Sequence, residues 1–315
     1  MENETKATES KKARLLPATI FASAIIIAGA WIYTSEPNEN SAKNEEKLSS
    51  TELEENVLPA DGVVLPIIWG DLGAKLAAAG AIDEDKFTAV YTQRGAFTDE
   101  YKNLLLGQNN GEFRMTKDNA GYLLNLFWAL GLASKNPILD SGEMADPKYG
   151  GAQRFASTAG WTLAQGNPMD HYSRHSFFEL TADQQALVDK VSRGIYRPCC
   201  GNSTHFPDCN HGMAMLGLLE LMASQGVNEQ NMWKTALAVN SYWFPDTYLT
   251  IAQYFANRGI AWDKVNAEEV LGASYSSAQG YQRILAEVQP VQLQGGGSCG
   301  VYGLDIIYPL GVYWR

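Results

Sequence analysis

Concentrated positive charge and the familiar catalytic motifs are both missing from this 315-residue sequence. Lys and Arg total 24 against 35 for Asp and Glu, and the basic residues form no cluster in the part that can fold. Because phosphate binding depends on concentrated positive charge, nucleic acid is not an expected partner. The formal net charge of −11 also argues against a folded surface that adheres to anionic lipid.

No motif identifies an enzyme. The chain has no Cys-x-x-Cys-His for covalent haem, no His-Glu-x-x-His, no Gly-x-Ser-x-Gly and no phosphate-binding loop. Asp140, Glu143 and Asp146 lie close in sequence and are of a type that binds Ca²⁺. They lack the spacing of an EF-hand, so we interpret them as a solvated acidic loop. These absences favour a non-enzymatic protein.

One long apolar run lies near the N-terminus. Residues 15–33 contain no charged side chain, and as a helix they would span about 28 Å, close to the hydrocarbon thickness of a bilayer. Basic residues precede the run and acidic residues come after it, so the positive-inside rule keeps residues 1–14 in the cytoplasm. The sequence therefore predicts a single-pass protein of the cell membrane, with a signal-anchor at 15–33 and the bulk of the chain extracytoplasmic.

A cleaved signal peptide is the alternative. Ala28-Gly29-Ala30 fits the small-x-small pattern of a signal-peptidase site, and cleavage near Ala30 would release a secreted protein. Either interpretation places the folded part outside the cytoplasm.

The rest of the chain divides into a stalk and a domain. Residues 34–57 are polar and acidic, too poor in apolar side chains to offset the entropy of ordering, which predicts a flexible stalk. Residues 58–315 are long enough to bury a substantial core as one extracytoplasmic domain.

Helical patterns dominate that domain. Residues 119–133 are apolar on all sides, which predicts a central helix, and residues 181–184 fit a capping box that opens another. Three helix–glycine–helix segments predict left-handed glycines at the helix ends. These are Gly80, Gly226 and Gly259. We therefore predict an all-α fold, a multi-helix globular domain that carries a Cys/His-rich loop.

That loop, residues 199–211, holds three of the four cysteines and two of the four histidines. Outside it, His171 and His175 are four residues apart, so a helix there would place both rings on one face. Thiolate and imidazole are ligands that Cu(I) and Zn(II) prefer, which predicts a copper or zinc site. The candidate ligands are Cys199, Cys200, Cys209, His211, His205, His171 and His175.

A helix that begins near Asn210 would direct its positive end at this loop and lower the pKa of nearby thiols. Three methionines lie farther along that helix, and thioether ligands would favour copper. We nevertheless interpret Met213, Met215 and Met222 as core residues.

Structural disulfide bonds are a second interpretation of the cysteines with at least equal weight, because exported cysteines usually pair and four is an even number. Adjacent Cys199 and Cys200 rarely bond each other, so one would join Cys209 and the other Cys299. A metal site and a disulfide can coexist. A thiol–disulfide oxidoreductase and a scaffold that binds another envelope protein are the alternative functions.

The loop also resembles part of a known class. Its order of Pro, Cys, Gly, His and Asp-Cys is similar to exported bacterial proteins named for a PCYCGC motif. The matching residues are Pro198, Cys199, Cys200, Gly201, His205, Asp208 and Cys209. The cysteines here are adjacent and one is missing, and the resemblance covers residues 198–209 alone. It implies an exported protein with a metal-binding Cys/His loop.

These features together predict a membrane-anchored accessory protein of the cell envelope, attached through its N-terminal helix.

Overall fold

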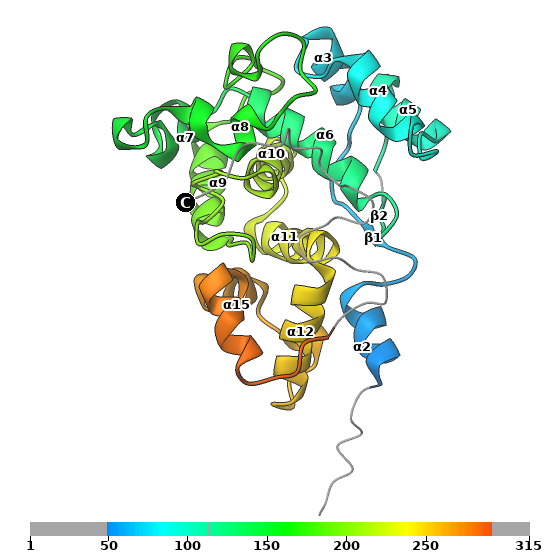
Figure 1. The fold of residues 1–315 in the computed structure, drawn as a ribbon, viewed down its shortest axis with the longest axis vertical. Helices are drawn as coiled ribbons and strands as arrows, with labels where there is room; N and C mark the ends of the chain where they lie inside the picture. The colour runs from blue at the N-terminus through cyan, green and yellow to red at the C-terminus, as the bar shows by residue number, and fades with distance from the viewer. Residues whose placement is uncertain (1–48, 113, 292–315) are drawn as a thin grey trace, which may run out of the picture. The chain divides into compact units, whose positions relative to one another are not determined.

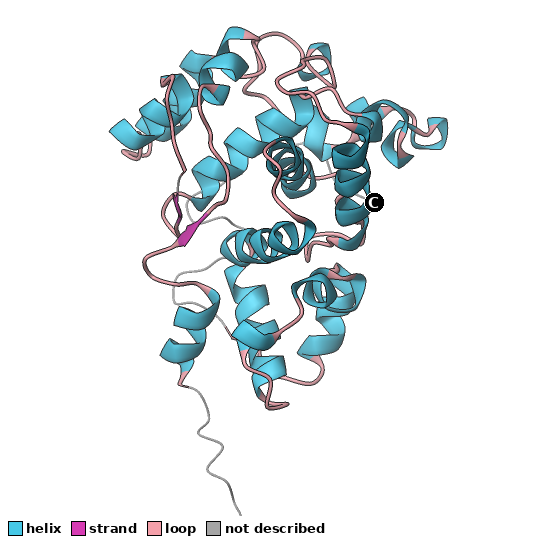
Figure 2. Ribbon diagram, turned by 180° about the vertical axis from the view of Figure 1, so that it is seen from behind, coloured by secondary structure: helices cyan, strands magenta, loops and turns pink. Residues whose placement is uncertain are grey.

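The computed structural model describes residues 49–112 and 114–291 (Figure 1). This part is helical apart from one antiparallel pair of short strands (Figure 2), which confirms the predicted all-α fold. Strand β1 (Val63–Val64) pairs with β2 (Arg114–Met115), with Val63 opposite Met115. The α-helices are α2 Ser50–Val57, α3 Leu72–Ala78, α4 Glu84–Thr92, α5 Asp99–Leu106, α6 Ala120–Ala133, α7 Pro137–Ser141, α8 Ala156–Ala159, α9 Ala182–Gly194, α10 Asn210–Ser224, α11 Glu229–Trp243, α12 Pro245–Ala256, α13 Ala267–Leu271, α14 Ala273–Ser276 and α15 Ala278–Leu285. The 3-10 helices are η1 Glu143–Ala145, η2 Pro147–Tyr149, η3 Ala152–Arg154, η4 Pro168–Asp170 and η5 Trp262–Lys264.

Several predicted features lie outside the described residues. They are the cytoplasmic segment 1–14, the signal-anchor at 15–33, the stalk up to residue 48, and Cys299. Within the part of the chain that is described, no helix combines the length and the apolar character needed to cross a bilayer.

The folded part begins earlier than predicted. Residues Ser50–Val57, assigned from the sequence to the flexible stalk, form helix α2, which a capping box between Ser49 and Glu52 opens. Leu53 and Val57, four residues apart on one face, are buried, and the helix packs beside α12 (Figure 1). Two apolar side chains on one face are enough to dock a helix whose overall composition is polar.

Two apolar helices form the centre of the molecule. Every residue of α6 is buried, as predicted for the segment 119–133, and so are residues 211–223 of α10. In Figure 1, α10 is seen nearly end-on, with α6, α9 and α11 around it. A helix that is apolar on all sides can be covered only by neighbours on all sides, which is why these two lie innermost.

Helices α6 and α10 approach each other backbone to backbone. A Cβ atom on Gly131 would lie 2.0 Å from the carbonyl oxygen of Met213, and one on Gly217 would lie 2.5 Å from the amide nitrogen of Gly131. Glycine at both positions is therefore required for the crossing.

The helix boundaries that the sequence predicts are also confirmed. Thr181 and Gln184 form the capping box at the start of α9. The glycines that end helices have left-handed φ angles of 75°, 76° and 72° at Gly80, Gly226 and Gly259.

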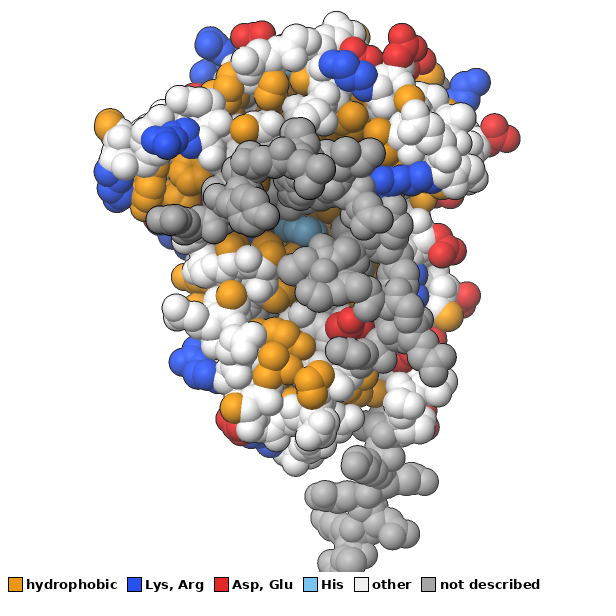
Figure 3. All heavy atoms as spheres, viewed as in Figure 1, with side chains coloured by type: hydrophobic (Ala, Val, Ile, Leu, Met, Phe, Trp, Pro, Cys, Tyr) orange, Lys and Arg blue, Asp and Glu red, His pale blue; other side chains and the backbone are white. Residues whose placement is uncertain are grey.

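Charged side chains of both signs share the surface. On the face shown in Figure 3, Lys and Arg are interspersed with Asp and Glu toward the edges, and apolar side chains lie between them.

One carboxyl group lies in the core. Glu220 of α10 is 1% exposed, and Oε1 accepts a hydrogen bond from the amide of Asn136, whereas Oε2 has no hydrogen-bond partner among the described residues. Burial raises the pKa of Glu220 well above its ordinary value. The folded protein therefore retains the proton on Glu220 at pH values where the unfolded chain has lost it.

Replacing Gly217 by Ala should destabilise the protein by about 3 kcal/mol, because the added methyl group forces the two central helices apart. Urea unfolding measures the change in free energy. Gly111→Ala is the matched control, since nothing lies within 4 Å of a Cβ atom at Gly111. Equal stability of the two variants would contradict the close crossing.

Replacing Glu220 by Gln should stabilise the protein increasingly as pH rises. A raised folded pKa gives stability that is complete below the unfolded pKa and is lost as pH rises toward the folded pKa. Gln does not titrate, so the variant should gain about 1.4 kcal/mol over the natural chain for each pH unit in that window. Unfolding in urea at about pH 5 and about pH 8 tests this. The exposed Glu179→Gln serves as control, and a difference that does not change with pH would refute the assignment.

Candidate metal centre

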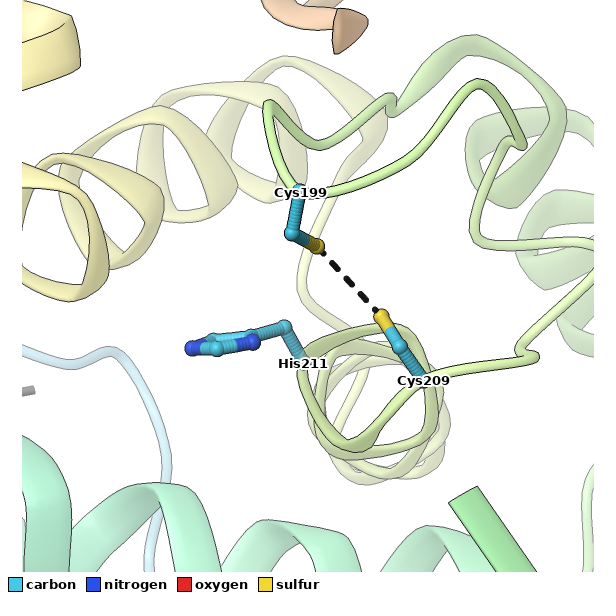
Figure 4. A group of neighbouring side chains, drawn as sticks. All are labelled: Cys199, Cys209 and His211. Atoms are coloured by element: carbon cyan, nitrogen blue, oxygen red, sulfur yellow. Dashed lines mark hydrogen bonds between the residues drawn. The ribbon is translucent and has the colours of Figure 1, made fainter. Parts of the chain in front are cut away.

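Three of the predicted ligands come together at the start of α10 (Figure 4). Cys199 lies on the loop that joins α9 to α10, whereas Cys209 and His211 belong to the N-terminal end of α10. Cys209 is the N-cap residue, and its sulfur accepts a hydrogen bond from the amide of Gly212 at 3.4 Å. The helix begins where the sequence predicts, so its positive end points at the loop.

The donor atoms of this group lie close together. The Sγ atoms of Cys199 and Cys209 are 3.6 Å apart, and with one ring nitrogen of His211 they all lie within 4.8 Å of one another. A second group, of Cys200, Asp208 and Cys209, meets the same limit and shares the Cys209 sulfur. Thiolate, imidazole and carboxylate within this distance could hold a metal ion.

The ring of His211 is enclosed without a hydrogen bond. Its side chain is 5% exposed, and neither ring nitrogen has a hydrogen-bond partner within residues 49–112 and 114–291. The ring packs at 4.4 Å from the ring of Phe244 and at 5.8 Å from that of Trp243, between centroids. Since buried polar atoms are almost always paired, two unpaired nitrogens beside two sulfurs indicate a missing partner.

A buried guanidinium lies beside the sulfurs. The Arg197 side chain is fully buried, and it donates from Nε to Cys209 Sγ and from Nη2 to Cys200 Sγ, both at 3.2 Å. Nη2 also lies 2.8 Å from Asp208 Oδ1. Room for the group comes from Gly212, where a Cβ atom would lie 2.7 Å from the guanidinium carbon.

One thiol of the group is ionised more readily than the others. Hydrogen bonds from the Cys199 and Cys200 thiols, together with the charge of Arg197, outweigh burial and hold the pKa of Cys209 well below its usual range. Hydrogen bonding to Cys200 and Cys209, with burial, raises the pKa of Cys199. Cys209 is therefore the thiol of the group that loses its proton most readily.

The carboxyl group of Asp208 is subject to two opposing effects. Burial raises the pKa of Asp208, while Arg197 opposes that rise. Oδ2 of Asp208 accepts a hydrogen bond from the side-chain amide of Asn202 at 2.8 Å. Asp208 thus holds the loop and the guanidinium together.

No protein-family model, curated protein or solved structure matches this chain.

The predicted disulfides are not present among the described cysteines. Cys199, Cys200 and Cys209 are all free, and the 3.6 Å between Cys199 and Cys209 is a contact between thiols, because a disulfide brings its sulfurs to about 2.05 Å. The predicted bond to Cys299 lies outside the described residues.

The pair His171 and His175 is brought together elsewhere in the fold. His171 Nε2 donates to the Gln165 carbonyl at 2.8 Å, so its Nδ1 is the acceptor for His175 Nε2 at 3.2 Å. The segment is not the helix considered from the sequence, since η4 ends at Asp170 and Ser173 has a φ of 52°. Neither histidine belongs to the groups of candidate ligands found among the described residues.

The imidazole of His205 is also engaged away from the cysteines. Its Nε2 atom lies 2.8 Å from Oδ1 of Asp189 on α9. Met213, Met215 and Met222 are fully buried core residues, as we interpreted them from the sequence.

Sequence reasoning missed Arg197, which has no motif of its own. An arginine is most often exposed, and only the folded loop shows that this one is enclosed by Asp208 and the sulfurs. The guanidinium fits only because residue 212 is a glycine, and the sequence gives no other local indication of its position.

Replacing Arg197 by Met should destabilise the protein by about 3–5 kcal/mol, because the buried charges of Asp208 and Cys209 lose their counter-ion. Urea unfolding of the full chain measures this change. Arg258→Met is the matched control, because Arg258 forms a surface ion pair with Glu287, and such pairs contribute about 1 kcal/mol or less. A loss no larger than that of the control would mean that Arg197 does not compensate buried charge.

Proposed function

We propose that this chain is a membrane-anchored, extracytoplasmic protein of the cell envelope that binds a copper or zinc ion through Cys199, Cys209 and His211. The observation that carries the proposal is the pair of sulfurs 3.6 Å apart, beside a buried imidazole whose nitrogens have no hydrogen-bond partner in the described part of the chain. The protein acts as a binding or accessory protein, because the sequence carries none of the common catalytic motifs beside the donor atoms.

The spacing of the sulfurs suits a shared ion. Two thiolates that bind one tetrahedral zinc at about 2.3 Å have sulfurs about 3.8 Å apart. The Cys199 and Cys209 sulfurs are within a few tenths of an ångström of that value. Binding would therefore require little movement of the loop or of α10.

The charges of the site also favour a metal. A ligand thiol must lose its proton before it binds, so metal and proton compete. Arg197 and the start of α10 support an ionised Cys209, which lowers that competition. One ligand is thus prepared before the ion arrives.

The choice between copper and zinc depends on the number of donors. Two sulfurs and one nitrogen satisfy Cu(I), whereas Zn(II) takes four ligands in structural sites. Cys200, which shares the second group with Cys209, is the residue that supplies a fourth donor for zinc. Both ions prefer this set to the oxygen ligands that Ca²⁺ requires.

Thiol–disulfide exchange is the second candidate function, and the short distance between Cys199 and Cys209 favours it. Exchange needs an accessible thiolate, however, because a thiolate attacks the disulfide of the substrate. Here the readily ionised thiol is Cys209, which is partly buried, while the exposed Cys199 has a raised pKa. This arrangement favours metal binding over exchange.

The proposed location derives from the N-terminal sequence. Residues 15–33 have the length and the flanking charges of an anchor that exports the rest of the chain. Disulfides form readily outside the cytoplasm, so a thiolate site there competes with oxidation of its cysteines.

The full chain, purified in detergent under reducing and oxygen-free conditions, should bind one Cu(I) or Zn(II) per molecule. Competition with a chromophoric chelator measures the affinity. Cys209→Ser and His211→Gln should each weaken binding by about a hundredfold or more, since loss of a ligand exceeds the effect of an outer-shell change. His175→Gln, which removes a histidine bonded to His171 instead, should bind as the natural chain does.

A thiol count made beside the titration separates the two functions. Reduced protein that takes up neither ion would end the metal proposal. If the same protein forms a Cys199–Cys209 disulfide with oxidised glutathione and returns to thiols with the reduced form, the exchange function replaces it.

A further inference from the structure

A second set of titratable side chains lines a cavity beside α9. The cavity has a volume of about 560 Å³ and lies beside α9 and the segment 140–147. Three carboxylates, one guanidinium and one imidazole line it. They belong to Asp140, Glu143, Asp146, Arg193 and His205.

The imidazole of His205 is held rigidly. Its side chain is about 5% exposed, and its backbone amide donates to the Ser192 carbonyl at 3.0 Å. Its Nε2 atom lies 2.8 Å from Asp189 Oδ1. A carboxylate that fixes one ring nitrogen is the usual partner of a metal-binding histidine.

Arg193 holds Asp189 in place beside His205. It donates two hydrogen bonds to Asp189, from Nε at 2.8 Å and from Nη2 at 3.0 Å. A carboxylate that receives two guanidinium hydrogen bonds in this way acts as the acceptor toward Nε2 of His205. In the neutral ring the donor is then Nε2–H, and Nδ1 keeps a lone pair.

That lone pair has no hydrogen-bond donor. Nδ1 of His205 is buried without a hydrogen-bond partner among the described residues. The nearest carboxylate oxygen is Oε1 of Glu143, at 3.6 Å. This separation is too long for a hydrogen bond but near the roughly 3.4 Å between two ligands of one tetrahedral zinc ion.

We propose that this cavity binds a divalent metal ion such as Zn²⁺ through Nδ1 of His205 and the carboxylate of Glu143, with Asp189 orienting the imidazole. Water completes the coordination, as the open cavity allows. Glu143 is 57% exposed, so its side chain can close the remaining few tenths of an ångström.

The surrounding charges are compatible with a cation. Asp140 and Asp146 also line the cavity. Each is paired with a lysine, at 3.0 and 2.9 Å, which compensates its charge. Arg193 is the cation that lines the cavity itself, and its two short bonds go to Asp189. Its contact with Glu143 is longer, at 3.7 Å, so Glu143 remains available.

The second site is independent of the thiolate centre. The two share the loop between α9 and α10, but no ligand is common to both. Oxygen and nitrogen donors also accept ions that thiolates do not hold tightly, such as Mn²⁺. The failure of either site therefore leaves the other untouched.

Titration of the reduced full chain with Co²⁺, a coloured substitute for zinc, tests the proposal. Cobalt bound to thiolates shows an intense sulfur-to-metal absorption in the near ultraviolet, whereas cobalt bound to nitrogen and oxygen shows weak visible bands only. We expect one equivalent of cobalt to bind with the weak visible bands of nitrogen and oxygen ligands. His205→Gln should abolish it, and Glu143→Gln and Asp189→Asn should weaken it about tenfold or more.

The controls separate the sites and guard against misfolding. Glu179→Gln removes an exposed carboxylate outside the cavity and should leave the second equivalent unchanged. Glu143→Gln alters an exposed side chain, so its circular dichroism should match that of the natural chain. Cobalt binding without the second kind of spectrum, or a second equivalent that persists in both His205→Gln and Glu143→Gln, would overturn the proposal.

Discussion

The close crossing of α6 and α10 is the constraint on which the rest of the structure depends. With glycine at Gly131 and Gly217 the two backbones touch, and α10 is enclosed almost from end to end. The first turn at its N-terminus is consequently half-buried, with Cys209 partly covered and His211 enclosed. The unpaired amides of that terminus need partners, and the Cys209 sulfur supplies one of them. The candidate metal centre is thus built on the capping of a buried helix.

The positive end of α10 favours negative charge beside it, and the loop before α10 supplies a counter-ion for that charge. Arg197 lies against Gly212 and bonds to Asp208 and two sulfurs, so opposite charges are paired without water. The loop therefore favours ionisation of the partly buried Cys209 thiol. On the side that faces α9, the same loop presents His205 to Asp189. The single loop between α9 and α10 thus carries side chains that belong to two separate groups of donor atoms.

Patterns that depend on neighbours in the sequence were predicted well. The apolar segment 119–133, the capping box at Thr181 and the start of the helix near Asn210 are all found, because each depends on side chains within one or two turns. The stalk prediction was wrong for Ser50–Val57, where composition hid a docking face of two residues. Composition measures an average, whereas docking needs only one face.

The sequence alone determined the helical class, the central helices and the Cys/His-rich loop at residues 199–211, because these depend on periodicity and on residues close in the chain. Only the tertiary structure decided how seven candidate ligands divide. His171 and His175 bond to each other, and His205 bonds to Asp189. Arg197 acquired a role in the same way. Burial and long-range pairing set these outcomes, and both depend on packing among helices that no local pattern encodes.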